Sequence, residues 1–418
     1  MALESDLQKV KEASRRFVMV DDALISDILR TLADRLEERT PEILEANAID
    51  LKKIESTHEL YDRLLLNEER IKAIAESVRE VAGYDSPIGV TLEEKTIENG
   101  MQLKKVSVPM GVVGAIFEAR PNVTVDTFVL CFKSKNACVM KGGSMAENSN
   151  EILVSIINEV IQEMKGENFE LNNVVLLLDN DRALVEEFLK KRQYVDVIVP
   201  RGGQGLIDFV RETSKIPVIE TGRGVVHTYF DKDGDIEKEQ KIVFNAKTQR
   251  PSVCNSLDTL IIHEDRLEDL PILCGKLSEK DVEIFADEQS YVALGGHYPA
   301  KRLRQASEEN FGKEYLSLKM SIKTSSGVYD AVSNVNKYGS GHSEAIITEN
   351  DEAAQVFLTG VDAAAVYLNA STRFTDGAVF GLGAEVGIST QKLHARGPMG
   401  IKEITSYKWI AIGDGQIR

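Results

Sequence analysis

Residues 111–117 read Gly-Val-Val-Gly-Ala-Ile-Phe, in which Val112 to Phe117 form a short apolar run of the kind that forms a buried strand. A polar segment, Glu118-Ala-Arg-Pro-Asn122, follows it and leads into an apolar helical stretch. Further short apolar runs alternate with helical patterns at residues 137–140, 174–178, 195–199 and 217–219. This alternation is typical of a parallel sheet covered by helices, which binds ligands at the carboxyl ends of its strands.

A second series of the same kind begins near residue 225, with apolar runs at residues 257–262, 283–286, 316–322, 345–348 and 364–368. We therefore expect an α/β protein with two doubly wound lobes. Ahead of both series, one helix face is predicted by the spacing of Leu24, Ile25, Ile28, Leu29, Leu32 and Leu36. The turn-like pair Asn99-Gly100 predicts a β-hairpin over residues 91–110.

Length and charge narrow the class of protein. The chain has 418 residues, enough for two to three domains with a real core. Its formal net charge of −17 disfavours a general electrostatic grip on nucleic acid or anionic lipid. No apolar run is long enough to span a membrane, and the four cysteines contain no C-x-x-C pair. We expect a cytoplasmic protein in a reducing compartment, with no membrane and no nucleic acid among its partners.

The sharpest chemical feature is the polar segment from Asn245 to Ser256, which holds one cysteine close to two cations. A thiol becomes a reactive thiolate when it is partly exposed in a positive field, and Lys247 and Arg250 supply that field for Cys254. The residues alone leave a nucleophile and an unreactive loop thiol as open alternatives. The remaining cysteines are predicted to lie in the core because their neighbours are apolar: Cys131, Cys138 and Cys274.

Polar groups after the strands of the first series form the second set of candidates. Asn122 offers an amide for an oxyanion hole, and Arg120 offers a guanidinium for a carboxylate or phosphate. Taken alone, however, these residues favour a helix cap with a surface arginine. Two glycine-bearing turns precede helices, and their amides suit a nucleotide phosphate or only a tight turn. These turns comprise Lys141, Gly142, Gly143 and Ser144, and Arg201, Gly202 and Gly203.

The C-terminal part carries a long polar run, residues 369–377, that is expected to anchor a substrate. His394 further along is as readily a structural histidine as a functional one. The six histidines show no spacing typical of a metal site, so we expect no metal.

Several of these segments together resemble a known family. The chain is similar to the γ-glutamyl phosphate reductases, also called glutamate-5-semialdehyde dehydrogenases, of the aldehyde dehydrogenase superfamily. The resemblance extends from the helical N-terminus to the last strand. Its most specific parts are Glu118 to Asn122, Pro200 to Gly203, Asn245 to Asn255, Asn369 to Phe374 and Gly381 to Pro398.

The resemblance implies an aldehyde-dehydrogenase-like fold with a β-hairpin and a C-terminal oligomerisation arm. It assigns residues 1–90 and 111–224 to a cofactor-binding domain and residues 225–399 to a catalytic domain. Residues 91–110 and 400–418 would be the oligomerisation elements of a homodimer or a higher homo-oligomer.

The resemblance also implies site residues. Cys254 would be the nucleophile, and Asn122 with the backbone N–H of Cys254 would form the oxyanion hole. The NADPH or NADP cofactor would be held by Lys141, Gly142, Ser144, Arg201, Gly202, Gly203 and Glu314. The substrate anions would be bound by Arg120, Lys247, Arg250, Arg373 and Arg396.

The activity so implied is reduction of L-glutamyl 5-phosphate to L-glutamate 5-semialdehyde with release of phosphate, the second step of proline biosynthesis from glutamate. A separate glutamate 5-kinase would supply the substrate and is a further expected partner. Glu220 is not expected to activate water, because hydride consumes the thioester and water has to be excluded. Val226 stands where many relatives have a cysteine. Two alternatives remain at this stage: an enzyme that reduces a different acyl group, and a noncatalytic nucleotide-binding protein.

Overall fold

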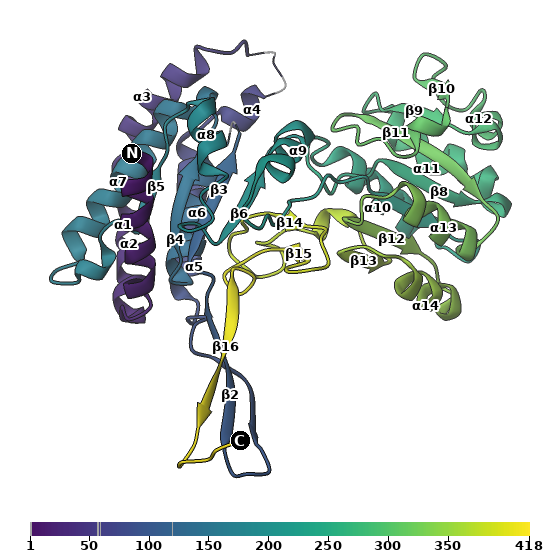
Figure 1. Ribbon diagram of the computed structural model, residues 1–418. Coiled ribbons are helices and arrows are strands. Elements are labelled where there is room, and N and C mark those ends of the chain that lie inside the picture. The colour runs from purple at the N-terminus through teal and green to yellow at the C-terminus, as the bar shows by residue number, and fades with distance from the viewer. Residues whose placement is uncertain (1, 57, 59, 119) are drawn as a thin grey trace. The chain divides into compact units, whose positions relative to one another are not determined.

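The computed structural model describes residues 2–56, 58, 60–118 and 120–418, which form two compact units (Figure 1). Unit 1 comprises residues 1–221, 381–387 and 393–418, and unit 2 comprises residues 222–380 and 388–392. The change of unit after residue 221 lies close to the expected domain boundary at 224. Residues 381–387 and 393–399, which the sequence analysis assigned to the second lobe, belong to unit 1 instead.

Unit 1 begins with a helical region and continues into alternating strands and helices. Its helices are α1 (Ala2–Phe17), α2 (Asp22–Glu38), α3 (Thr40–Leu51), α4 (Tyr61–Leu64), α5 (Glu68–Gly83), α6 (Asn122–Lys133), α7 (Glu147–Met164), α8 (Arg182–Phe188) and α9 (Gln204–Thr213). Its strands are β1 (Thr91–Thr96), β2 (Gln102–Pro109), β3 (Val112–Phe117), β4 (Ala137–Lys141), β5 (Val175–Leu177), β6 (Val197–Arg201), β15 (Gly397–Pro398) and β16 (Thr405–Ile412).

The local sequence explains where these elements begin. The carboxylate of Asp21 accepts a hydrogen bond from the Ala23 N–H at 2.7 Å and caps α2. The apolar stripe predicted between Leu24 and Leu36 forms the inner face of that helix, where Leu29 and Leu32 are fully buried. The expected hairpin is confirmed as β1 and β2, and Gly100 in its turn has a φ of +85° that favours glycine.

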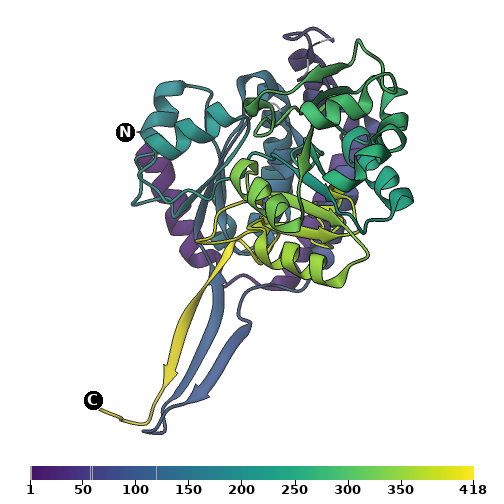
Figure 2. The same ribbon diagram turned by 90° about the vertical axis from the view of Figure 1, so that its right-hand side faces the viewer.

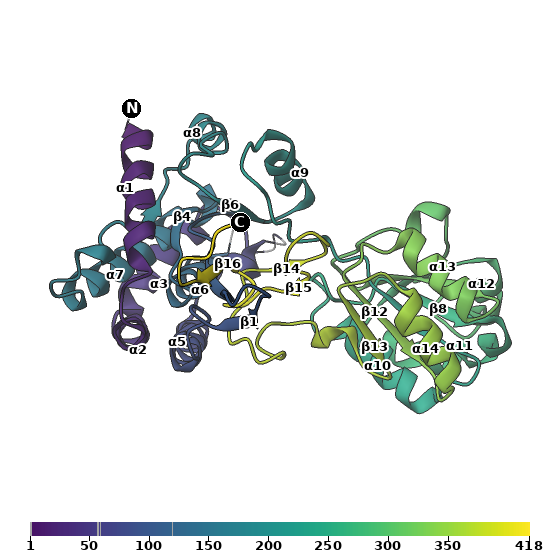
Figure 3. The same ribbon diagram turned by 60° about the horizontal axis from the view of Figure 1, so that its bottom comes forward.

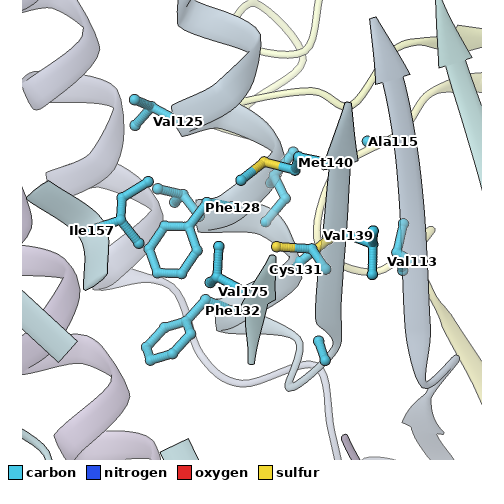
Figure 4. Packing of buried hydrophobic residues seen from close by; sticks show 14 of the residues in the cluster. Val113, Ala115, Val125, Phe128, Cys131, Phe132, Val139, Met140, Ile157 and Val175 are labelled. Carbon is cyan, nitrogen blue, oxygen red and sulfur yellow. The ribbon is translucent and has the colours of Figure 1, made fainter. Parts of the chain in front are cut away.

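Four parallel strands in the order β5-β4-β3-β6 form the sheet of unit 1. Figure 4 shows the core where α6 packs on this sheet, with Phe128, Cys131 and Phe132 gathered near Met140 of β4 and Val175 of β5. The expectation that Cys131 is a core residue is confirmed. The strands end at one edge, so the residues that follow β3, β4 and β6 come together there.

Strands β1, β2 and β16 form a separate three-stranded antiparallel sheet in unit 1. Figure 2 shows these strands extending together as a narrow arm away from the helices of unit 1. Strand β16 pairs along the whole of β2, from Thr405 opposite Pro109 to Ile412 opposite Gln102. The last apolar segment of the sequence is therefore a strand of this arm.

Unit 2 is a second α/β unit, built on seven parallel strands in the order β10-β9-β11-β8-β7-β12-β13. Its strands are β7 (His227–Phe230), β8 (Thr259–His263), β9 (Glu283–Ala286), β10 (Leu303–Gln305), β11 (Lys319–Ser325), β12 (Ser343–Ile347), β13 (Ala365–Leu368) and β14 (Ile388–Ser389). Its helices are α10 (Ile236–Thr248), α11 (Leu270–Ser278), α12 (Glu288–Leu294), α13 (Val328–Tyr338) and α14 (Asp351–Gly360).

Helices cover both faces of this sheet (Figure 3). Phe230 packs in one cluster with residues of α10 and α11, whereas its neighbour Tyr229 packs in another with residues of α13 and α14. Successive side chains of a strand point to opposite faces, so the two clusters lie on opposite sides of the sheet. Each unit is thus an α/β layer structure with a parallel sheet, which confirms the expected fold class. Residues 217–219 differ from expectation, since only Val218 forms an isolated bridge, to Ile198.

Candidate active site

Cys254 lies in unit 2, in the turn that joins the end of α10 to the start of β8. Pro251 follows the helix and prevents its continuation. The Leu257 N–H donates to the Ala246 carbonyl at 3.0 Å, which folds the turn back on the last helical residues. Cys254 is half-buried, whereas the remaining cysteines are buried in the core as expected. Among the four thiols, it is therefore the one with access to a substrate.

The polar run 369–377 packs against this turn within unit 2. The Asn255 amide donates to the Thr375 carbonyl at 2.8 Å, and the Thr372 hydroxyl donates to the Asn255 carbonyl at 2.9 Å. The Ser371 hydroxyl donates to the Asn245 side chain at 2.7 Å. Two motifs separated by more than a hundred residues thus form one surface around Cys254.

Two guanidinium groups accompany this surface. The Arg373 Nε donates to the Gln249 side chain at 3.1 Å, and Arg250 is exposed beside it. Partial burial lowers the pKa of Arg373, an effect that the nearby Asp376 carboxylate and Cys254 oppose and that Arg250 reinforces. Arg373 is therefore close enough to Cys254 and to Arg250 to interact electrostatically with each of them, and a cation beside a thiol favours its thiolate form.

Lys247 does not belong to this exposed surface. Its side chain is fully buried at the end of α10, with Nζ 3.8 Å from Oδ1 of the buried Asp258. Burial lowers the pKa of Lys247 and raises that of Asp258, while their mutual attraction opposes both shifts. The role of Lys247 in substrate binding stays a prediction, and the structure places its ammonium group against a partner inside the unit.

The backbone leading into β7 packs directly against the cysteine. A Cβ at Gly224 would lie 1.6 Å from the Cys254 carbonyl oxygen, so only glycine fits there. The Gly224 N–H donates to Oε1 of Glu314 at 3.1 Å. Glu314, expected to hold a cofactor ribose, is therefore next to the Cys254 turn within unit 2. We call Gly224, Cys254 and Glu314 the cysteine cluster.

In unit 1, the expected cofactor residues gather at the carboxyl edge of the sheet. The backbone N–H of Gly203, which precedes α9, donates to Oε2 of Glu118 at 2.8 Å. A Cβ at Gly202 would lie 2.7 Å from the same carboxylate. Burial lowers the pKa of the half-buried Lys141, and the Glu118 and Glu147 carboxylates oppose that shift. Residues after β3, β4 and β6 thus meet as the strand pattern predicted.

After the turn from Lys141 to Ser144, a carboxylate of the chain likewise accepts backbone amides at the helix start. The buried Asp50 of α3 accepts the Ser149 N–H at 2.8 Å and the Asn148 N–H at 3.3 Å, in the first turn of α7. A Cβ at Gly142 would lie 2.0 Å from the Asn150 amide. Packing therefore explains this glycine, while the exposed Ser144 side chain stays accessible.

Asn122 is the first residue of α6 in unit 1. Its Nδ2 donates to Oδ2 of Asp126 at 2.9 Å, and burial raises the pKa of Asp126 to about 6 against the opposing effect of Arg201. Arg120 is half-buried just before the helix. Arg396 is exposed in the same unit, where the exposed His394 contacts the Glu403 carbonyl through Nε2 at 2.7 Å.

Sequence reasoning missed two carboxylates. Glu118 was treated only as part of a motif, although it binds the amide ahead of α9. Asp258 interrupts the apolar run 257–262 at a position that the structure buries. A charged residue at the start of a buried strand was the available signal for it.

Among the described residues, no group of three or more His, Cys, Asp or Glu side chains is arranged to hold a metal ion. None of the described helices is both long and apolar enough to cross a membrane.

Comparison with known proteins gives consistent relatives. No family model matches the chain. It is 52% identical over 417 residues to the gamma-glutamyl phosphate reductase of Chlorobaculum parvum, a match that covers 100% of this chain and 98% of the relative. It is also 52% identical over 417 residues to the enzyme of that name from Bacteroides thetaiotaomicron, covering 100% and 99%.

Solved structures agree with these sequence relatives. The crystal structure of gamma-glutamyl phosphate reductase from Thermotoga maritima matches with a TM-score of 0.93 and 40% identity, covering 100% of this chain and 99% of that chain. A glyceraldehyde-3-phosphate dehydrogenase from Methanocaldococcus jannaschii complexed with NADP matches with a TM-score of 0.70 and 16% identity, covering 98% and 94%. The latter similarity shows a shared fold.

Proposed function

The chain belongs to the gamma-glutamyl phosphate reductase family, and we propose that it reduces L-glutamyl 5-phosphate to L-glutamate 5-semialdehyde with NADPH, through a thioester on Cys254. Family membership makes it an oxidoreductase of proline biosynthesis. The observation that carries the mechanism is the half-buried Cys254 thiol close to the guanidinium group of Arg373.

The first step is attack of the Cys254 thiolate on the acyl carbon. A carbon–sulfur bond forms, the bond from that carbon to the phosphate oxygen breaks, and phosphate leaves with the electron pair. The side chain of Asn122 and the backbone N–H of Cys254 are the proposed donors to the developing oxyanion. The anionic groups of the substrate are proposed to be bound by Arg120, Arg250, Arg373 and Arg396.

The second step reduces the thioester. NADPH held by residues such as Lys141, Gly203 and Glu314 would supply the hydride for the acyl carbon and would be converted to NADP. Cys254 then leaves the resulting thiohemiacetal as thiolate, which gives the aldehyde and restores the enzyme. The aldehyde product cyclises to pyrroline-5-carboxylate without an enzyme. Exclusion of water protects the thioester during this step, and no general base is assigned to activate water.

Each unit contains groups that suit part of a dinucleotide. The Lys141 ammonium and the exposed backbone at Gly202 and Gly203 suit ribose and phosphate oxygens, and the Glu314 carboxylate suits a ribose hydroxyl pair. Ser144 and Arg201 complete the proposed set, with Gly142 contributing backbone only. A solved structure of the same fold holds NADP, which supports a nicotinamide cofactor here.

The reverse reaction tests this proposal. Purified protein with NADP, phosphate and glutamate semialdehyde is expected to form reduced cofactor, followed by absorbance at 340 nm. Cys254→Ser is expected to lower the rate to background while the circular dichroism spectrum and melting temperature stay unchanged. Turnover that persists in this variant would exclude Cys254 as the nucleophile.

A panel of acyl phosphates and aldehydes decides between glutamate and another side chain. A wild-type protein that binds dinucleotide but turns over none of them would be a noncatalytic nucleotide-binding protein.

We also propose that the arm of β1, β2 and β16 joins copies of the chain into a homo-oligomer. Large apolar side chains are exposed along β16, namely Tyr407, Trp409, Ile410 and Ile412. Exposed apolar strands usually mark an interaction surface. Light scattering after gel filtration of wild type and Trp409→Asp tests this, and a monomeric wild type would refute it. The same column run with added glutamate 5-kinase tests the proposed contact with that enzyme.

A further inference from the structure

The buried ion pair of Lys247 and Asp258 lies directly behind the cysteine cluster in unit 2. Neither side chain has appreciable exposure, and their charged atoms are 3.8 Å apart. Within the described residues, Lys247 Nζ has no hydrogen-bond partner. Removing two charges from water is costly, and apolar residues of similar volume commonly stabilise a fold as well or better. The pair therefore calls for an explanation other than stability.

Hydrogen bonds to the Asp258 carboxylate provide that explanation. Its Oδ1 accepts the Tyr315 N–H at 2.9 Å, and its Oδ2 accepts the Val226 N–H at 3.4 Å. Tyr315 is the residue after Glu314, and Val226 is two residues after Gly224. One carboxylate thus fixes the backbone on both sides of the hydrogen bond between Gly224 and Glu314.

Lys247 connects the same carboxylate to the segment that carries the cysteine. It lies in the last turn of α10, beside Ala246. The Ala246 carbonyl accepts the Leu257 N–H at 3.0 Å and the Ser256 hydroxyl at 3.2 Å. The attraction between Lys247 and Asp258 therefore holds the helix end, the Cys254 turn and the Glu314 segment in one arrangement.

We propose that Lys247 and Asp258 are positioning residues that hold Glu314 and the Cys254 backbone in register through the backbone amides of Val226 and Tyr315. Neither residue touches the substrate. Their effect is to fix the position of the Glu314 carboxylate relative to a cofactor ribose. This part of the proposal rests on the proposed function, which assigns the ribose contact to Glu314. Displacement of a positioned group by about 1 Å is enough to cost up to about a hundredfold in rate.

Asp258→Asn in the full chain is the principal test. The change keeps the size of the side chain and removes its charge. In the reverse reaction, we expect the KM for NADP to rise at least about tenfold and kcat to fall, while the KM for phosphate changes less than about twofold. A purely structural role would lower the amount of active protein without separating the two KM values.

Asp287→Asn is the matched control. Asp287 also accepts backbone N–H groups, from Thr324 at 2.6 Å and Ser290 at 3.0 Å, but it lies just after the carboxyl end of β9, whereas Asp258 lies just before the amino end of β8. We expect its kinetic constants to equal those of wild type. If Asp258→Asn does not fold, Lys247→Met supplies the same comparison, because it removes the cation and retains the carboxylate.

Alkylation of Cys254 by iodoacetamide, followed by mass spectrometry, is the second readout and does not require turnover. We expect its rate to change at least about threefold in Asp258→Asn and to stay unchanged in Asp287→Asn. Equal alkylation rates and equal KM values for NADP in wild type and Asp258→Asn would overturn the proposal. An inactive wild type would refute the proposed function, and the alkylation rates would still decide whether the pair positions the cysteine.

Discussion

The proposed functional groups lie at opposite ends of the strands in the two units, and they are held differently. In unit 2, these groups precede β7, β8 and β11 and are held by buried charges and by side chains bonded to backbone, as at Asp258 and Thr372. In unit 1, the chain places its own carboxylates, Asp50 and Glu118, on the amides at the starts of α7 and α9. The difference suits the proposed roles, because a nucleophile has to be fixed in position whereas a site for an anionic cofactor has to exchange its occupant.

The largest effect is expected from Gly224→Ala in unit 2. A Cβ at this position would overlap the Cys254 carbonyl oxygen, so the backbone of the cysteine cluster has to move. We expect turnover to fall at least about a thousandfold, as measured by the reverse reaction.

The matched control for this change is Gly205→Ala in unit 1, where a Cβ would meet no atom within 4 Å. It is expected to keep nearly full activity. If Gly224→Ala were as active as Gly205→Ala, the cysteine cluster would not require the close contact that the structure shows.

Asn122→Ala is expected to have the next largest effect. Loss of one oxyanion donor typically costs on the order of a hundredfold in rate, so kcat should fall by that amount and not vanish. Stopped-flow measurement of the acylation step in the reverse reaction gives the most direct value. Asn172→Ala, at a half-buried asparagine elsewhere in unit 1, serves as control. A variant with unaltered acylation would show that the Asn122 side chain serves only its hydrogen bond to Asp126 within α6.

Glu118→Gln is expected to have a smaller effect, on cofactor binding in unit 1. The Glu118 carboxylate is exposed, accepts the Gly203 N–H and lies near Lys141, where it repels a negatively charged phosphate. Its neutralisation is expected to lower the KM for NADP about two- to fivefold at low salt, because an exposed charge near a helix start is worth only a few tenths to about 1 kcal/mol.

Glu212→Gln, at the far end of α9, should leave the KM for NADP unchanged. A rise of the KM in Glu118→Gln would contradict the repulsion and would indicate that Glu118 itself contacts the cofactor.

Much of the fold could be predicted because the spacing of apolar residues within each segment indicates its secondary structure. The run 112–117 became β3 with the expected bounds, and the apolar spacing after Asp21 became α2. The strand expected at residues 217–219 is not formed, because Val218 pairs with Ile198 in a single isolated bridge. A short apolar run says that a segment is buried and does not say whether a neighbouring strand is available to pair with it.

The parts that could not be predicted depend on long-range packing. The ion pair that buries Lys247 requires Asp258 to come back beside the end of α10, and no local pattern encodes that approach. Residues 381–387 belong to unit 1 because Gly383 packs on Val81 and Tyr84 of the helical region. Cys254 itself could be singled out from the sequence, since its polar and basic surroundings differ from those of the other cysteines.

The smallest effect is expected away from both sites, at Glu239 in the first half of α10. Both carboxylate oxygens are buried without a hydrogen-bond partner in the described structure, and burial raises the pKa of Glu239 from 4.5 to about 8. A carboxyl group whose pKa is higher in the folded state contributes stability that is fully present below pH 4.5 and is lost as the pH rises through about 8.

Glu239→Gln should therefore melt at a higher temperature than wild type at alkaline pH, with a difference of about 2–4 °C that grows between pH 6 and pH 9. Differential scanning calorimetry at several pH values measures this, with the exposed Glu237→Gln in the same helix as control. Glu239 lies on α10, which also carries Lys247. The experiment therefore compares a buried carboxyl group that has no hydrogen-bond partner in the described structure with a buried lysine that is paired with Asp258. A difference in melting temperature that stays constant with pH would mean that Glu239 is already ionised in the folded protein at pH 6, and that a buried charge in unit 2 does not need an oppositely charged partner of the kind that Lys247 has in Asp258.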